Sequence, residues 1–208
     1  SYMNKNNTTQ TVISSYNIKN LSLGLSGNHY DGFGGGGIST GSVSVVFGYL
    51  DILGTSAPGY GKYTPSSFTK FALSGSRNQQ ITEDGLTSVY LAISGQLASA
   101  NLNSAEQFYL GGPYGVRAYP VAQAAGTQGG LATLEIRRQL PQNLTLSAFF
   151  DAGTVQQYKN IYPGWQGLTN ANNTYSLMGA GLGLKWISGG WNVAGMVAWR
   201  VGSNPLYN

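Results

Sequence analysis

Side chains that could carry out catalysis are scarce in this sequence. His29 is the one histidine and cysteine is absent, so a Cys-His pair is excluded and a Ser-His-Asp triad would depend on a single residue. The segment Asn28-His29-Tyr30-Asp31-Gly32 has the composition of a turn, and so does Glu83-Asp84 before Gly85. We therefore expect no enzyme activity and no catalytic, metal-binding or cofactor-binding residues.

Patterns for binding phosphate or nucleic acid are equally weak. The run from Gly34 to Gly37 could cradle a phosphate, but no helical pattern follows it and no Lys-Ser/Thr pair closes it. The sequence pI is about 9.2, yet the 11 Lys and Arg residues are scattered, with Arg137-Arg138 as their one adjacent pair. A nucleic-acid partner is therefore not expected.

The composition indicates which class of fold must position any functional residues. The 208 residues include 31 glycines but are only 9% charged, whereas soluble domains are about 25% charged. The mean hydropathy is -0.12, no apolar run reaches the roughly 18 residues of a spanning helix, and the 12% aromatic content argues against disorder. An all-β protein remains, either a secreted sandwich or a transmembrane barrel.

Alternation of apolar with small or polar residues, typical of transmembrane strands of about 9–11 residues, recurs along the chain. In the stretch 86–97, Leu91 and Ile93 lie on one face while Ala92 and Ser94 lie on the other. Together the alternating segments predict eight strands, at 21–25, 43–49, 67–77, 86–97, 130–140, 144–151, 175–187 and 191–201.

The connections between these segments differ in length as those of an outer-membrane barrel do, with short periplasmic turns and long extracellular loops. The tight turns are 139–143 and 188–190, and the long segments, rich in Gly, Pro, Asn and Tyr, are 51–65, 101–128 and 156–173. Trp186, Trp191 and Trp199 near strand ends suit an aromatic girdle. A two-layer sandwich is the structural alternative, but its solvent faces would carry more Lys, Glu and Thr.

One acid and one base stand out once the strand faces are assigned. Phe149, Asp151 and Gly153 lie opposite the leucines of their strand, so Asp151 faces the lumen if those leucines face lipid. A lone carboxylate in a partly desolvated lumen is unfavourable without a partner. Arg117, in the loop 101–128, can bond it bidentately if the loop folds inward. We expect this loop in the lumen, with Arg117 beside Asp151.

A row of glycines offers a surface for such a loop. Gly179, Gly181 and Gly183 share one face of the segment 175–187. Because they have no side chain, three lumen-facing glycines would let an inserted loop pack closely against the wall. The predicted site therefore combines the loop, the acid on one strand and the glycines on another.

Two motifs make the sequence resemble a known family. The segment 108–120, Phe-Tyr-Leu-Gly-Gly-Pro-Tyr-Gly-Val-Arg-Ala-Tyr-Pro, resembles the Val-Arg-Gly/Ala-Tyr/Phe loop motif of Omp85-superfamily transporters at Val116, Arg117 and Tyr119. The segment 149–153, Phe-Phe-Asp-Ala-Gly, is similar to the Phe-x-Asp-x-Gly strand motif of that superfamily. The Leu-Gly-Gly-Pro of the loop and a later Asn204-Pro205 are similar to the TpsB branch, the haemolysin secretion/activation proteins of the ShlB/FhaC/HecB type.

This resemblance implies an antiparallel transmembrane β-barrel in the bacterial outer membrane, surrounded by outer-membrane lipid. It implies that the protein secretes a large TpsA-like exoprotein, of the haemolysin or adhesin type, without ATP and as a monomer. Family members carry periplasmic POTRA domains before a barrel of about sixteen strands. We expect residues 1–208 to be one partial barrel domain, the second half without its closing strand, with no POTRA domain. Gln123 and Thr127 replace two acids usual in the family's loop.

Two other function classes stay open on the sequence alone. A barrel of eight strands would suffice for a passive porin or a surface adhesin. Related Omp85 proteins, in addition, insert other barrels into the membrane rather than secrete proteins. POTRA domains upstream and a gene for a large secreted protein next door would favour secretion.

Overall fold

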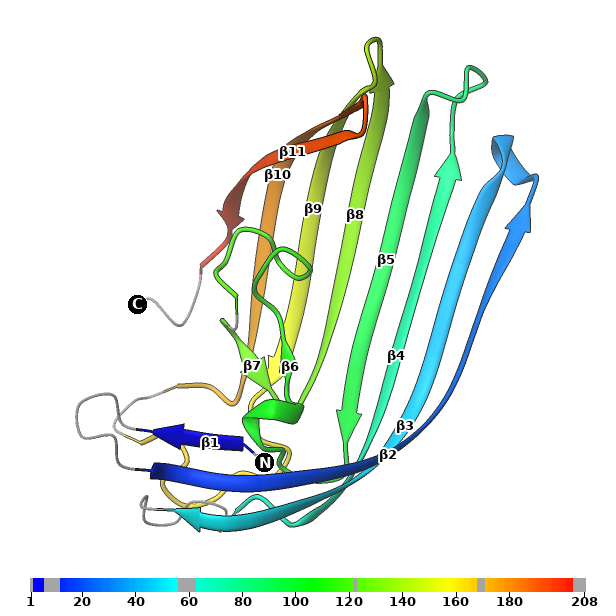
Figure 1. Ribbon diagram of the computed structural model, residues 1–208. Coiled ribbons are helices and arrows are strands. Elements are labelled where there is room, and N and C mark those ends of the chain that lie inside the picture. Colours follow the sequence, from blue (N-terminus) through cyan, green and yellow to red (C-terminus); the bar gives the residue numbers. More distant parts are fainter. Residues whose placement is uncertain (1, 6–11, 56–62, 122, 168–170, 204–208) are drawn as a thin grey trace.

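The computed structural model describes the chain except for residues 1, 6–11, 56–62, 122, 168–170 and 204–208. Its described strands form one strongly curved antiparallel sheet (Figure 1). In sheet order they are β1 (Tyr2–Lys5), β2 (Val12–Asp31), β3 (Gly37–Thr55), β4 (Ser67–Gln80), β5 (Thr87–Ala98), β8 (Gln128–Leu140), β9 (Leu144–Gln156), β10 (Thr174–Ser188) and β11 (Trp191–Val201). The predicted all-β class and partial barrel of eight long strands are confirmed, with the short β1 as an addition.

Each strand of this sheet pairs with the next along the chain, except that a long connection separates β5 from β8. That connection holds a short 3-10 helix, η2 (Ser104–Glu106), and a small hairpin of β6 (Phe108–Tyr109) and β7 (Ala125–Gly126). Figure 1 shows it lying against the concave side of the sheet. We call this side the inner face and the convex side the outer face.

The alternation in the sequence separates the two faces chemically. On the outer face the register places Leu25 opposite Val43, and Val43 opposite Leu73. These side chains remain exposed, Leu25 at 78%, which is unusual for such large apolar groups unless lipid covers them. The inner-facing neighbours Ser42 and Ser74 are small and polar. The sheet therefore has one apolar and one polar face, as the wall of an outer-membrane barrel does.

The ends of the strands carry connections of different length, with short turns at one end and long loops at the other (Figure 1). Gln142 and Asn143 have φ of 62° and 61° in the turn after β8, a conformation typical of tight hairpins. In the turn after β4, Asp84 accepts from the Leu86 amide at 2.9 Å, and hydrogen bonds from Thr82 and Leu86 lower its pKa. Glu83-Asp84 is thus part of a turn, and the hydrogen bonds of that turn favour the ionised form of Asp84.

Some boundaries differ from those predicted. The segment with His29 is not a turn, because His29 pairs with Ser39 inside the β2–β3 ladder and the turn begins at Gly32, before the 3-10 helix η1 (Phe33–Gly35). The strands β2 and β3 have 20 and 19 residues, about twice the length needed to cross a bilayer. Asn204-Pro205 lies outside the described residues.

Candidate functional site

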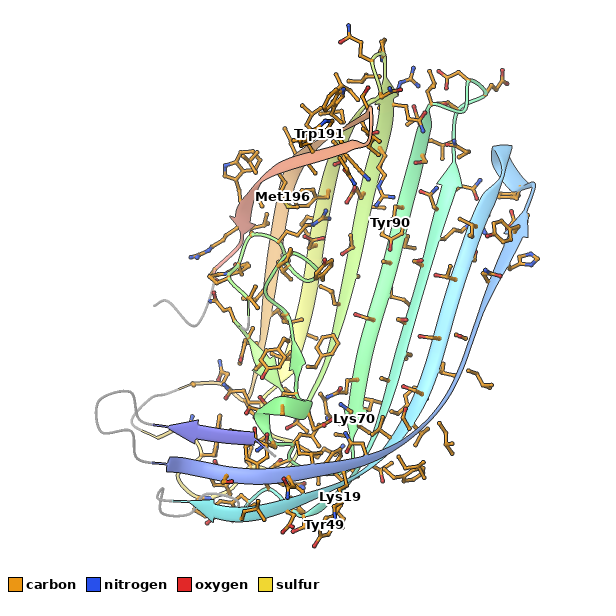
Figure 2. The ribbon with its side chains drawn as sticks, viewed as in Figure 1. Lys19, Tyr49, Lys70, Tyr90, Trp191 and Met196 are labelled. Atoms are coloured by element: carbon orange, nitrogen blue, oxygen red, sulfur yellow. The ribbon has the colours of Figure 1, made fainter. Side chains whose placement is uncertain are left out.

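The long connection between β5 and β8 is anchored at its base by side chains of the sheet. Gln96 Nε2 donates to the carbonyl oxygens of Glu106 at 3.0 Å and Thr127 at 3.1 Å. Lys70 Nζ lies 2.7 Å from Glu106 Oε2, a salt bridge at the loop end of β4 (Figure 2). The buried Thr127 hydroxyl donates to the carbonyl of Gln157 at 2.8 Å, so this residue, at a position where the family resemblance led us to expect an acid, bonds the neighbouring loop.

The tip of this loop folds back on itself in a tight turn. The Val116 amide donates to the Leu110 carbonyl at 2.6 Å, and the Gly115 amide to the Gly112 carbonyl at 3.0 Å. Gly112 has φ of 114°, a conformation that residues with a Cβ rarely adopt. Gly112 and Gly115 of this Leu-Gly-Gly-Pro-Tyr-Gly segment thus create the sharp turn that presents Arg117 to the sheet.

The guanidinium of Arg117 meets two acids on the inner face. Its Nε and Nη2 donate to the two oxygens of Asp151, each at 2.9 Å, and its backbone amide donates to Asp151 Oδ2 at 3.1 Å. Its Nη1 donates to Glu135 Oε2 at 2.7 Å. The guanidinium carbon also lies 3.4 Å from the ring centroid of Phe149, so the cation is stacked on an aromatic face as well as paired.

The acids of this cluster are bonded on their remaining sides. Asp151, 0% exposed, also accepts from the Thr133 hydroxyl at 3.0 Å. Glu135 also accepts from Arg137 Nε at 2.9 Å. Two arginines therefore balance two carboxylates, and every acid oxygen has a partner, which is the condition under which buried charges are tolerated.

Apolar contacts hold the loop on either side of the ion pair. The buried cluster is formed by Leu110, Val116, Tyr119 and Ala124 of the loop with Val155, Tyr175 and Leu177 of the wall. A Cβ placed on Gly153 would lie 2.5 Å from Leu110 Cδ2, and one on Gly179 would lie 2.7 Å from Ala118 Cβ. These two wall glycines are therefore needed for the loop to approach this closely.

The other two glycines singled out from the sequence have different neighbours. Gly181 makes room for the Phe149 ring, and a Cβ on Gly183 would meet the Ser147 hydroxyl at 2.7 Å. Only Gly179 of the three therefore contacts the loop directly. Gly181 acts one step away, because it lets Phe149 lie flat under the Arg117 guanidinium.

The structure thus brings together the predicted loop residues Val116, Arg117 and Tyr119 with the wall residues Phe149, Asp151 and Gly153. Three contributors to the site were not predicted: Glu135, Arg137 and Thr133. The alternation could have located all three, because residues 133, 135 and 137 lie on the inner face of β8 while Leu134 and Ile136 lie on its outer face. A charged residue at an inner position could have been assigned to the site from this pattern alone.

Within the described residues, no group of three or more His, Cys, Asp or Glu could hold a metal ion. In the same part of the chain, no helix is long and apolar enough to cross a membrane. The arrangement around Arg117 is a permanently charged clamp, since guanidinium stays protonated and both acids are paired. Its chemistry suits holding a loop in place rather than moving protons.

A curved antiparallel sheet with an apolar outer face, a polar inner face and a loop clamped on that inner face defines an outer-membrane β-barrel transport protein. The chain belongs to the haemolysin secretion/activation protein family ShlB/FhaC/HecB, which matches it over residues 2–186. The predicted family and outer-membrane location are thereby confirmed.

Individual relatives and solved structures share a modest part of their sequence with this chain. The heme/hemopexin transporter protein HuxB of Haemophilus influenzae is 36% identical over 99 residues, which cover 46% of this chain and 17% of HuxB. HuxB of the Rd strain is 34% identical over the same share. CdiB from Escherichia coli superposes with a TM-score of 0.60 at 19% identity, over 99% of this chain and 46% of CdiB. The chain therefore spans less than half the length of these proteins, and the relatives are transporters rather than enzymes.

Proposed function

We propose that this chain forms the second half of a barrel that secretes a large partner exoprotein of the TpsA type across the outer membrane. The observation that supports this most strongly is the clamp of Arg117 on Asp151 and Glu135, which fixes the loop on the inner face. Export uses no ATP, and folding of the partner outside the cell supplies the direction.

The site then has a defined role in this proposal. The loop from 101 to 128 occupies the lumen of the complete barrel, and residues Val116, Arg117 and Tyr119 orient it against the wall. Passage of the exoprotein requires the loop either to shift or to act as a template beside the moving chain. The apolar outer face contacts lipid, and one barrel forms one pore.

The test replaces Arg117 with alanine in the intact transporter. Because the clamp positions the loop, we expect Arg117→Ala to lower the amount of exoprotein in the medium by at least about tenfold, the effect of about 1.4 kcal/mol in a rate. The amount of folded barrel in the outer membrane should stay near normal. Arg138→Ala is the matched control, since Arg138 is partly exposed and pairs with Asp84 in a turn.

Two outcomes would contradict the proposal. An equal loss of export and of folded barrel would mean that the clamp serves folding alone. The second outcome concerns deletion of the transporter. If every secreted protein stays at its normal level while other barrels are lost from the membrane, the protein is an outer-membrane assembly factor instead.

A further inference from the structure

A second feature of the inner face lies beside the loop rather than beneath it. A groove of about 440 Å³ lies between the loop tip, Pro113 to Gly115, and the inner faces of β3, β4, β5 and β8. Arg117 and the β8 residues Glu135 and Arg137 line its β8 side. This volume would hold roughly fifteen water molecules at about 30 Å³ each. The loop therefore covers one part of the wall and leaves the adjacent part open.

Hydroxyl groups line the open part. Thr40 and Ser42 of β3 pair with Ser76 and Ser74 of β4 through hydroxyl–hydroxyl contacts of 2.7 Å and 2.8 Å. Ser94 continues this row on β5, and a neighbouring hollow extends it to Ser26 and Asn28 of β2. Within the described part of β2 to β5, Lys70 at the loop end is the one charged side chain on the inner face.

The other part of the inner face is charged rather than neutral. The wall charges gather on β8, β9 and β11, with Glu135, Arg137, Asp151 and Arg200. The loop packs on this side, and its tip closes the groove there. The inner face is thus divided into a charged half that binds the tip of the loop and a neutral, hydroxyl-rich half that the loop contacts at its base, through Lys70 and Gln96, and leaves open beside its tip.

The neutral half has the chemistry needed to accommodate an extended polypeptide of any sequence. The peptide N–H and C=O groups of a chain in transit need partners wherever bulk water is limited. A serine or threonine hydroxyl can both donate and accept, so a row of them can bond either group without fixing a register. On the β3 to β5 side, neutral, small side chains neither attract nor repel the charges of the passing chain, and on the β8 side Glu135 is paired with both Arg117 and Arg137. Tyr90, stacked under Arg137 with 4.4 Å between guanidinium carbon and ring centroid, borders the groove on β5 (Figure 2).

We propose that the exported polypeptide moves along this hydroxyl-lined groove, between the wall of β3 to β5 and the tip of the loop, while Arg117 stays bound to Asp151. This inference rests on the proposed secretion function and assigns the loop the role of a fixed template. Undocking the loop would strip a buried carboxylate of three hydrogen bonds from Arg117. A transporter without ATP does not have to break these hydrogen bonds if the exported chain passes through the open groove beside the docked loop.

The test places single cysteines in the intact transporter, which is simple because this chain has none. Ser74→Cys and Ser94→Cys report on the groove. Ser147→Cys is the matched control, because Ser147 is also an inner-face serine but lies on β9, two strands from β5, and is not among the residues that line the groove. The probe is the protein that disappears from the medium when the transporter is deleted, carrying cysteines along its length and a fast-folding domain that stalls it in the pore.

Oxidation of the stalled complex should cross-link the probe to Ser74→Cys and Ser94→Cys several-fold more than to Ser147→Cys. Three outcomes would overturn the proposed path along the groove but leave the proposed secretion function standing. They are equal cross-linking at all three positions, cross-linking at Ser147→Cys alone, and no cross-linking at any position although the probe is stalled. If deletion of the transporter removes no protein from the medium, the proposed secretion function itself fails.

Discussion

At the scale of single residues, the site is specified by an arginine whose donors are divided unequally between two acids. Asp151 accepts three hydrogen bonds from Arg117, whereas Glu135 accepts one and keeps Arg137 as a second partner. Buried ion pairs of this kind often add little net stability, although removing one member costs about 3–5 kcal/mol. We therefore assign the cluster to positioning the loop.

This division predicts unequal effects of neutralising the two acids. Asp151→Asn should lower export more than Glu135→Gln, because Asp151 has the larger share of the Arg117 bonds and is fully buried. Secretion into the medium, normalised to folded barrel, measures the effect. A larger loss for Glu135→Gln would show that the Arg137–Glu135–Arg117 chain carries the function instead.

The wall glycines give a second prediction at this scale. Gly179→Val should displace the loop, because even a Cβ there would collide with Ala118. Protease cleavage within the loop should become faster and export should fall. Gly195→Val on β11 is the matched control, since a Cβ at Gly195 would meet nothing within 4 Å. Equal protease sensitivity in the two variants would contradict the proposed packing.

At the scale of elements, three loops meet at one end of the sheet around Asn101. Its Nδ2 donates to the carbonyls of Tyr63 at 3.0 Å and Asn160 at 2.9 Å, and its Oδ1 accepts from the Asn160 amide at 2.8 Å. Tyr63 and Tyr162 stack with ring centroids 4.0 Å apart. A hydrogen bond with Tyr158 raises the pKa of Tyr162 to about 12. The Tyr162 phenol therefore stays protonated at physiological pH and stacks on Tyr63 as a neutral ring.

Loss of this junction should loosen the loops without dissolving the sheet. Asn101→Ala removes the side-chain partner of three backbone groups, the carbonyls of Tyr63 and Asn160 and the Asn160 amide, and so breaks the link between the three loops. We expect faster protease cleavage in 99–107 and 157–167 and an unchanged yield of folded barrel. Asn172→Ala, at an exposed position, should have no effect. Equal cleavage in both variants would refute the role of Asn101.

The sequence predicted these elements to different degrees. Alternation located all eight long strands, because lipid on one side and water on the other impose a period of two. It did not predict the length of β2 and β3, since their distal residues Tyr16 and Leu50 are buried at 4% and 2% exposure under other segments rather than in lipid. That burial depends on tertiary contacts that a periodicity does not contain.

The site shows the same limit. Arg117 and Asp151 could be paired from the cost of a lone lumenal acid together with the family resemblance. The backbone hydrogen bond from Arg117, the stacking on Phe149 and the role of Glu135 depend on how the loop tip turns at Gly112 and Gly115. These contacts arise from three-dimensional packing between segments distant in the sequence.

At the scale of the whole molecule, the inner face has two halves. The charged half binds the loop, and the hydroxyl-rich half remains open beside it. In our account the loop stays docked during export and the polypeptide passes along the open half. Since the loop never leaves the wall, a covalent tether between them should be harmless.

The measurement that tests this most directly is export with the loop locked to the wall. One methyl carbon of Val116 lies 3.3 Å from the position of a Cβ on Gly179, so Val116→Cys with Gly179→Cys can form a disulfide, and Ala118→Gly makes room for it. The variant with Val116→Cys and Ala118→Gly alone controls for the oxidant. The account predicts that the cross-linked transporter exports its partner about as well as the reduced one. Export that stops on oxidation and returns with a reductant would contradict it.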